Sequence, residues 1–244
     1  MKDISKIIVF SILGVGGGVS PSFAASGDST LTLGYAHFQF PGLNDFIKSV
    51  GVHNRSTVNS FVNNSLTSSG QYTNASVTGY EGKEKSPQGI NIKYRYEITD
   101  DFGVITSFTW TRSLTNTQSF VNVEAVDKNT QIKNPAASGR TDIRANYWSV
   151  LAGPTWRFND YISLYAMTGM GVAKVSADFK IKDNLNIGAG NYSVSDSIKK
   201  SSLAWAAGAQ FNFNESVTMD VAYEGSGSGD WRSSGMVVGI GLKF

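Results

Sequence analysis

Large apolar residues alternate with small or charged residues along the last nine positions of the chain. One face of this segment carries Met236, Val238, Ile240, Leu242 and Phe244, and the other carries Val237, Gly239, Gly241 and Lys243. A period of two predicts a β-strand with one apolar face. The aromatic C-terminal residue lies on that face, which favours a strand that turns its apolar side to lipid in a closed barrel.

The same alternation recurs in seven earlier segments, which gives an even total of eight predicted strands. These segments are Thr30–Phe40, Gly89–Thr99, Phe102–Arg112, Ile143–Phe158, Tyr161–Val175, Leu203–Phe213 and Val217–Glu224. Long polar segments and short turns alternate between them, as in barrels with long external loops and short periplasmic turns. We therefore expect an all-β fold over residues 25–244, an eight-stranded antiparallel transmembrane β-barrel with external loops at 41–87, 114–142, 180–200 and 225–231.

Aromatic residues gather at both ends of these predicted strands. The turn end would carry Phe102, Trp156, Phe158, Tyr161, Phe211, Phe213 and Phe244, and the loop end Tyr35, Phe38, Phe40, Trp110, Trp148, Trp205, Tyr223 and Trp231. Two such girdles are typical of proteins that meet both membrane interfaces. The alternative is a soluble eight-stranded barrel such as a lipocalin, which would turn its apolar faces inward and gives no reason for the girdles.

The first 24 residues have the three parts of a secretory signal peptide. Lys2 and Lys6 flank the start, an apolar stretch follows to Val19, and Ser22-Phe23-Ala24 forms a small-x-small cleavage site. We expect cleavage after Ala24. The alternative is an uncleaved anchor helix, which the shortness of the apolar stretch and its glycines disfavour.

Composition narrows the possible functions. The 244 residues include 41% hydrophobic residues, 26 glycines and no cysteine, and they carry a formal net charge of +2. One main domain is expected, a disulfide scaffold and a thiol nucleophile are excluded, and the small charge does not indicate a nucleic-acid partner. The sequence contains no recognisable cofactor or metal motif, and the glycines at 225–229 lack the strand-to-helix setting of a nucleotide-binding loop.

Charged residues on the polar faces of the predicted strands would point into the barrel. They are Lys93, Arg95, Glu97, Arg157, Asp220 and Glu224. An eight-stranded barrel is only just wide enough for side chains, and buried charges need partners. We expect a structural ion-pair network that fills the lumen; a catalytic or proton-relay site is the alternative.

Several segments resemble the OmpX/Ail/PagC/Rck/Lom family of small enterobacterial outer-membrane β-barrel proteins. They are Gly89–Glu97, Gly103–Thr109, Ala152–Arg157, Gly208–Phe213, Tyr223-Glu224 and Val238–Phe244, in order and at compatible spacing. The resemblance implies location in the Gram-negative outer membrane, contact with lipopolysaccharide and the barrel assembly machinery, and adhesion, invasion or complement (serum) resistance through external loops. We interpret Tyr223, Val238, Ile240, Leu242 and Phe244 as the C-terminal assembly signal. The first loop is longer than is usual in the family.

Two features suggest how such loops would contact host cell-surface or matrix proteins, glycans or complement regulators. The segment Phe120–Val126 has strand-like composition, so strands extending beyond the bilayer could expose an edge for strand addition. Basic residues in or beside the loops could meet anionic glycans or lipopolysaccharide, or could simply be solvated. These residues are Lys128, Lys133, Arg140, Lys180, Lys182, Lys199 and Lys200.

Two further functions stay open. One is a membrane-integrity or stress barrel without a dedicated ligand, which the sequence does not separate from the first. The other is an enzyme that modifies lipid A, which would need a nucleophile and a base. The chain has only two histidines, His37 and His53, and His37, with Asp45 nearby in sequence, is the candidate base. We expect no enzyme and assign no catalytic residue.

Overall fold

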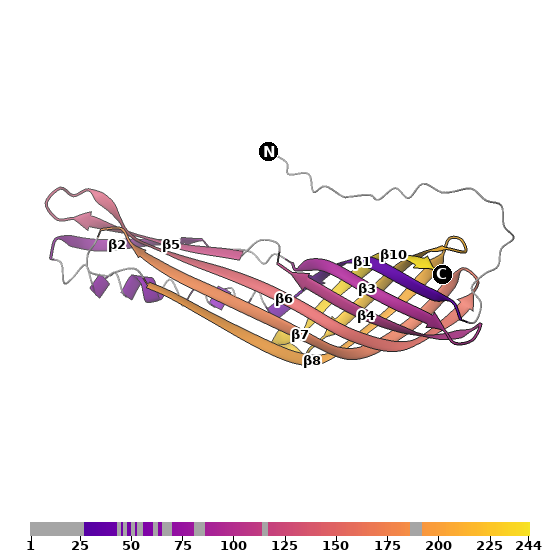
Figure 1. Ribbon diagram of the computed structural model, residues 1–244. Coiled ribbons are helices and arrows are strands. Elements are labelled where there is room, and N and C mark those ends of the chain that lie inside the picture. Colours follow the sequence, from indigo (N-terminus) through magenta and orange to yellow (C-terminus); the bar gives the residue numbers. More distant parts are fainter. Residues whose placement is uncertain are drawn as a thin grey trace.

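The computed structural model describes residues 27–42, 45, 48–49, 52, 56–60, 63–64, 70–80, 86–113, 117–185 and 192–244 (Figure 1). The predicted signal peptide and His53 lie outside these residues. The strands are β1 (Ser29–Gln39), β2 (Tyr72–Tyr80), β3 (Gln88–Glu97), β4 (Phe102–Arg112), β5 (Thr117–Asp127), β6 (Lys133–Asn159), β7 (Ile162–Asp183), β8 (Tyr192–Asn212), β9 (Val217–Ser226) and β10 (Ser233–Lys243), with a 3₁₀ turn η1 (Gly229–Trp231) before the last.

No helix within the described residues is both long enough and apolar enough to cross a membrane.

Antiparallel pairing closes part of the chain into a ring. Among the described strands, β1 pairs with β3 on one side and with β10 on the other, and β4, β6, β7, β8 and β9 complete the circle in that order. The backbone N–H of Ser29 donates to the carbonyl of Phe244 at 2.9 Å, so the two ends of the ring lie together. The predicted all-β antiparallel barrel is confirmed.

Three strands of the ring continue past the barrel and form an open sheet, here called the outer sheet (Figure 1). It consists of β2, β5, residues 133–145 of β6, residues 173–183 of β7 and residues 192–203 of β8. Much of the predicted loops at 114–142 and 180–200 is therefore strand, and β2 lies within the predicted loop 41–87. The sequence pattern was misleading because the polar face of each strand carries Ser, Asn and Lys, which are also common in loops.

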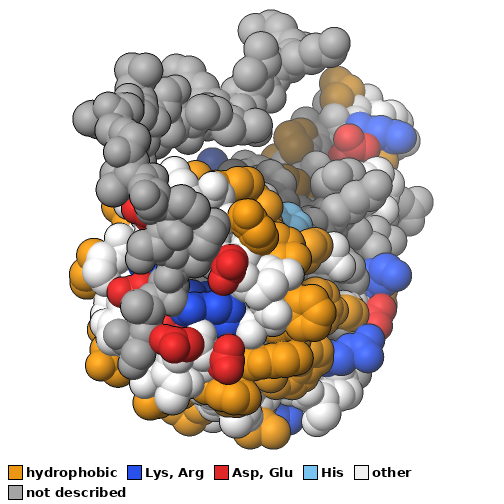
Figure 2. Space-filling model, turned by 90° about the vertical axis from the view of Figure 1, so that its right-hand side faces the viewer, with side chains coloured by type: hydrophobic (Ala, Val, Ile, Leu, Met, Phe, Trp, Pro, Cys, Tyr) orange, Lys and Arg blue, Asp and Glu red, His pale blue; other side chains and the backbone are white. Residues whose placement is uncertain are grey.

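The barrel has the inverted distribution of a membrane protein. On the outside, Leu33 is 64% exposed and Ile240 is 58% exposed, whereas Lys93 and Arg95 on the inside are each 1% exposed. Figure 2 looks at the barrel end that carries the short turns, where hydrophobic side chains lie around the wall and basic and acidic side chains occupy the middle. A soluble barrel would show the opposite arrangement.

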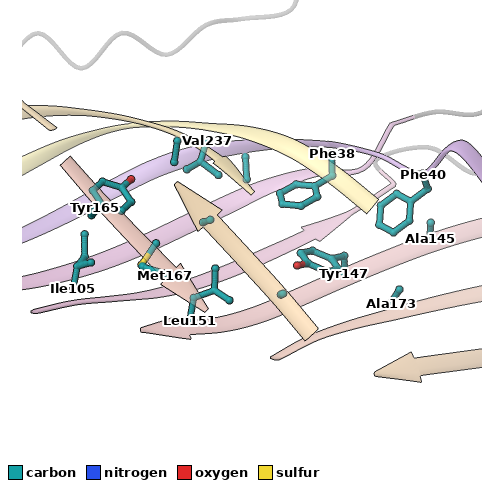
Figure 3. Packing of buried hydrophobic residues seen from close by; sticks show 14 of the residues in the cluster. Phe38, Phe40, Ile105, Ala145, Tyr147, Leu151, Tyr165, Met167, Ala173 and Val237 are labelled. Carbon is teal, nitrogen blue, oxygen red and sulfur yellow. The ribbon is translucent and has the colours of Figure 1, made fainter. Parts of the chain in front are cut away.

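Most predicted girdle residues lie on the outer wall, but Phe38 and Phe40 do not. They are 0% and 5% exposed because Phe38 shares the inward face of β1 with Ala36 and Phe40, just after the strand, points the same way. The Phe38 and Phe40 rings lie 4.7 and 6.1 Å from the Tyr147 ring between centroids, inside the barrel end next to the outer sheet (Figure 3). Trp231 also packs against this cluster. These aromatic residues close the outer mouth of the lumen.

The outer sheet has a hydrophobic core of its own on its inward face. The core consists of Val58, Val121, Val123, Ala125, Ala136, Ala137 and Ile181. Val58 belongs to the helical residues 56–60 of the first long connection, and it is completely buried. A Cβ atom at Gly139 would lie 3.0 Å from Val58 Cγ2 and 3.6 Å from Phe179. Part of the first connection is thus held on the sheet through an apolar contact.

Candidate functional site

The six charged residues predicted for the lumen all lie inside the barrel, and they form three groups along its axis. Nearest the short turns, Glu97 Oε1 lies 2.5 Å from Arg95 Nη2 and 3.2 Å from Arg157 Nη2. Arg95 also donates to Gln210 Oε1 at 2.6 Å. Because Arg95 and Glu97 are two residues apart on β3, they share the inward face.

The second group is a closed triad. Lys93 pairs with Asp220, and Tyr165 connects the two residues, accepting from Lys93 Nζ at 2.9 Å and donating to Asp220 Oδ2 at 2.8 Å. The sequence missed Tyr165, because Tyr165 and Met167 interrupted the expected apolar face of β7. Tyr165 and Met167 alternate with the apolar face and share their side of the strand with the polar Ser163. This alternation was the available signal that both residues point into the lumen.

The third group surrounds Glu224 near the outer mouth. Its carboxylate accepts hydrogen bonds from Tyr147 at 2.8 Å, Ser149 at 2.5 Å and Thr109 at 2.9 Å. Hydroxyl donors were not among the partners expected for this residue. Ile105, Leu151 and Met167 fill space between the groups (Figure 3). Charged, hydroxyl and apolar side chains together occupy the lumen.

The face of the outer sheet that points away from its core, here called the outward face, is basic and exposed. Its basic residues are Lys133, Arg140 and Arg144 on β6, Lys174, Lys180 and Lys182 on β7, and Lys199 on β8. Arg140 binds Asp142 at 2.9 Å and lies over the Phe120 ring at 5.7 Å, and Arg144 binds Asp178 at 2.9 Å.

The lysines of the outward face have a different environment from the arginines. Across the part of the chain that the structure describes, no carboxylate forms an ion pair with Lys174, Lys180, Lys182 or Lys199. Lys174 lies directly opposite Lys199, and Lys180 lies directly opposite Arg140. Like charges in directly opposed positions repel each other. The outward face therefore has an excess of positive charge.

The seven basic residues predicted from the sequence divide between several places. Arg140, Lys180, Lys182 and Lys199 lie on the outward face. Lys200 points inward, over the Trp231 ring at 5.7 Å. Lys128 donates to the Gly70 carbonyl at 2.7 Å. Lys133 starts β6 as an exposed residue opposite Val126, which also places it on the outward face. The sequence missed Lys174 and Arg144 because both fell within predicted barrel strands.

The turn from β5 to β6 is built around Asp127. Its Oδ1 accepts from the backbone N–H groups of Thr130 at 3.1 Å and Asn129 at 2.8 Å, and Gln71 donates to Oδ2 at 3.1 Å. These hydrogen bonds favour the ionised carboxylate and hold the pKa of Asp127 below its ordinary value. The same turn contains Gln131 with a φ of 57°.

The expectation that Phe120–Val126 is a strand and that strands extend past the barrel is confirmed, but this segment is not at a sheet edge. These residues belong to β5, which pairs with β2 on one side and with β6 on the other. β2 occupies one edge of the outer sheet, and residues 192–203 of β8 occupy the other. The extra strand β2, hidden in the long first connection, could not be recognised from its short and mixed sequence.

His37, the candidate base of the enzyme alternative, is half-buried on β1, opposite Met236 of β10 and Gln88 of β3. It is on the same side of β1 as Leu33 and Tyr35, which face away from the lumen. The residues that the structure describes contain no group of three or more His, Asp or Glu side chains placed to hold a metal ion.

Comparison with known proteins gives concordant matches. Residues 54–244 match the family model of the enterobacterial Ail/Lom protein. The outer membrane protein lom of Escherichia phage lambda is 30% identical over 98% of this chain and 97% of its own length. The attachment invasion locus protein of Yersinia pseudotuberculosis is 37% identical over 66% of this chain and 74% of its own length. Ail of Yersinia pestis, solved with the heparin analogue sucrose octasulfate, is 27% identical with a TM-score of 0.52, over 90% of this chain and 99% of that one.

Proposed function

The chain belongs to the enterobacterial Ail/Lom family of outer-membrane proteins, and from this premise we propose that it is a surface adhesin whose outer sheet binds polyanionic glycans. The observation that carries the proposal is the lysine set of the outward face. Lys174, Lys180, Lys182 and Lys199 are exposed, and two directly opposed pairs of like charge lie among the strands. An anion bound across such a pair would relieve the repulsion.

The chemistry of a sulfated or carboxylated glycan suits this face. Ammonium groups form charge-assisted hydrogen bonds with anionic oxygens, and a flat sheet lets a chain-like ligand cross several strands. The Yersinia pestis relative was solved with a sulfated heparin analogue, which supports the same ligand class here. Lipopolysaccharide carries phosphate groups of related chemistry and is a second source of such anions.

Purified protein in nanodiscs, applied to a heparin matrix, tests the proposal. We expect the K174Q/K180Q variant to elute at lower salt than the wild type, because both lysines lie on the outward face. The control variant K128Q/K200Q removes the same charge from residues off that face, because Lys128 lies in the β5–β6 turn and Lys200 points inward. It should elute close to the wild type. Equal losses in the two variants would mean that only net charge matters, and the proposal would fail.

We also infer the membrane orientation and processing of the chain. The short turns and the joined ends of the barrel lie at one end, and the outer sheet lies at the other. This supports periplasmic turns and an outer sheet, with the connections at 41–87, 114–142, 180–200 and 225–231, outside the cell. Residues 1–24 are then a signal peptide, so amino-terminal sequencing of extracted protein should start at Ala25. Protease applied to intact cells should cut the outer sheet; protection of the sheet would reverse the orientation.

We assign the lumen groups a structural role and the C-terminal strand a role in assembly. Val238, Ile240 and Leu242 form an exposed apolar row on β10, which the exposed Phe244 continues. Tyr223 of β9 lies opposite Met236 of β10. This row suits recognition by the barrel assembly machinery. Phe244→Ser should lower the amount of assembled barrel in the outer membrane, and unchanged assembly would remove this role.

We assign a binding activity and no catalytic activity. Complement resistance would follow from capture of a host regulator by the outer sheet. Lipid A from cells that express the wild type or His37→Ala should be identical. A difference would revive the enzyme alternative. A membrane-integrity function without ligand would leave adhesion and serum survival unchanged when the outward face is altered.

A further inference from the structure

Buried hydroxyl groups gather in the half of the lumen next to the short turns, here called the short-turn end. Each is 0–1% exposed, and across the part of the chain that the structure describes no hydrogen bond reaches its oxygen. They belong to Thr30 on β1, Thr155 on β6, Ser163 on β7 and Thr218 on β9. Because a buried hydroxyl without a hydrogen bond is costly, such a group indicates an ordered water molecule or a bound ion.

Two arginines lie at the same level of the lumen as these hydroxyl groups. Thr30 is directly opposite Arg95 on β3, and Ser163 is directly opposite Arg157 on β6. Thr155 lies two residues before Arg157 and shares its inward face. The Nε atom of Arg95 is itself buried and has no hydrogen-bond acceptor among the described residues. The four hydroxyl groups and this N–H can all donate, which suits a ligand that accepts hydrogen bonds.

Gly241 on β10 keeps space open beside the hydroxyl groups. It lies directly between Thr218 on β9 and Thr32 on β1. A Cβ atom at this position would lie 2.6 Å from Thr32 Oγ1 and 3.1 Å from Thr30 Cγ2, and it would also contact Thr218 Oγ1. Threonines from two strands thus converge on a position that has no side chain of its own.

The charges at the short-turn end are not balanced locally. Arg95 and Arg157 both pair with the carboxylate of Glu97, so these three side chains carry one more positive than negative charge. The neighbouring triad already pairs its lysine with its aspartate. The sixth charged residue of the lumen groups, Glu224, lies near the outer mouth and accepts from three hydroxyl groups there. An anion at the short-turn end would balance the excess charge where it arises.

The space at the short-turn end is closed on one side and reaches the barrel end on the other. Towards the middle of the lumen, Gln210 closes it through hydrogen bonds with Arg95 at 2.6 Å and Thr32 at 3.4 Å. At the barrel end, Lys243 is partly exposed, and Asp28 is close enough to interact with its charge. Basic side chains are visible in the middle of this end in Figure 2. A small ion could therefore enter from the side of the short turns.

From these observations we infer that the short-turn end of the lumen binds a small monovalent anion of the halide class, such as chloride. Arg95 supplies positive charge and an N–H donor, and the hydroxyl groups of Thr30, Ser163 and Thr218 supply further donors. A water molecule would satisfy some of these donors but would bring no negative charge. Larger anions are excluded, because an eight-stranded barrel is only just wide enough for side chains. This inference does not depend on glycan binding by the outward face.

Bromide is the direct probe, because it replaces chloride and gives an anomalous signal in crystals. Protein refolded and crystallised in bromide should show an anomalous peak in the lumen, within hydrogen-bond distance of Arg95 Nε. Peaks confined to the outer surface would mean an adventitious ion only, and that result, or the absence of any peak, would overturn the inference.

Two matched variants test the site in solution. Thr218→Val removes a hydroxyl of the short-turn end, whereas Thr111→Val removes a buried and unpartnered hydroxyl of β4 opposite Tyr147, near the outer mouth. Each protein is refolded in chloride or in the bulky anion gluconate at equal ionic strength, and its thermal midpoint is measured. The midpoint of the wild type and of Thr111→Val should be higher in chloride, and Thr218→Val should lose most of this difference. Equal midpoints of the wild type in both salts would mean that water alone occupies the site, and equal losses in the two variants would overturn the assigned position.

Discussion

At the scale of single residues, charge pairing in the lumen has the clearest energetic meaning. Lys93 and Asp220 are 1% and 0% exposed and contact each other and Tyr165. Removing one member of a buried ion pair leaves an uncompensated charge, whereas replacing both by apolar or neutral groups can be tolerated. The lumen groups are therefore expected to respond to single and double substitutions in opposite ways.

Asp220→Asn should lower the free energy of unfolding by about 3–5 kcal/mol, because it leaves Lys93 buried without its carboxylate. The double variant Lys93→Met with Asp220→Asn should recover a large part of this loss. Urea unfolding in detergent, followed by tryptophan fluorescence, measures both. A double variant less stable than Asp220→Asn would contradict the pairing.

Asp127 makes the β5–β6 turn sensitive to acid. Its folded pKa is below the ordinary 3.8, so the turn is fully stabilised above that pH and loses the stabilisation as pH falls through the lowered pKa. Exchange protection factors of the Asn129 and Thr130 amides should fall below pH 3.8. The control is the backbone N–H of Phe102, which donates a hydrogen bond to the Thr99 hydroxyl. Its protection factor should not fall in the same pH range. Constant protection at both turns would remove the role of Asp127.

At the scale of elements, the barrel strands could be predicted because each must be apolar on its lipid face. Leu31, Leu33 and Ile240 had to be large and apolar wherever they lay in the ring. The outer sheet has no such requirement, since water meets its outward face. Its strands look like loops in sequence, and β2 is defined only by pairing across 40 residues or more, such as Tyr72 with Asp127. For the candidate site, individual lysines could be named from the sequence. Which basic residues lie directly opposite each other on neighbouring strands could not be predicted.

Val58→Asp should release the first long connection from the outer sheet and leave the barrel folded. Val58 is completely buried, and loss of a buried valine contact costs about 1.5–3 kcal/mol before the charge is counted. Limited proteolysis should cut between residues 56 and 64 faster than in the wild type. Val52→Asp, at a residue 62% exposed in the same connection, is the control. Equal cleavage of both variants would mean that the Val58 contact does not hold the connection.

At the scale of the whole molecule, the fold separates anchoring from recognition. The barrel presents apolar residues to lipid and fills its lumen with its own side chains, and the outer sheet presents exposed lysines beyond it. A filled lumen is expected not to conduct. Planar-bilayer recordings of the wild type should show no steady conductance, and a stable open pore would contradict the filling described.

We propose the outward face of the outer sheet as the adhesive surface. Its most direct test is adhesion to cultured host cells by a non-adherent laboratory bacterium that expresses the wild type, K174Q/K180Q or K128Q/K200Q at equal surface levels. We expect that the wild type and K128Q/K200Q adhere, that soluble heparin competes, and that K174Q/K180Q loses most adhesion. Full adhesion by K174Q/K180Q, unaffected by heparin, would contradict it.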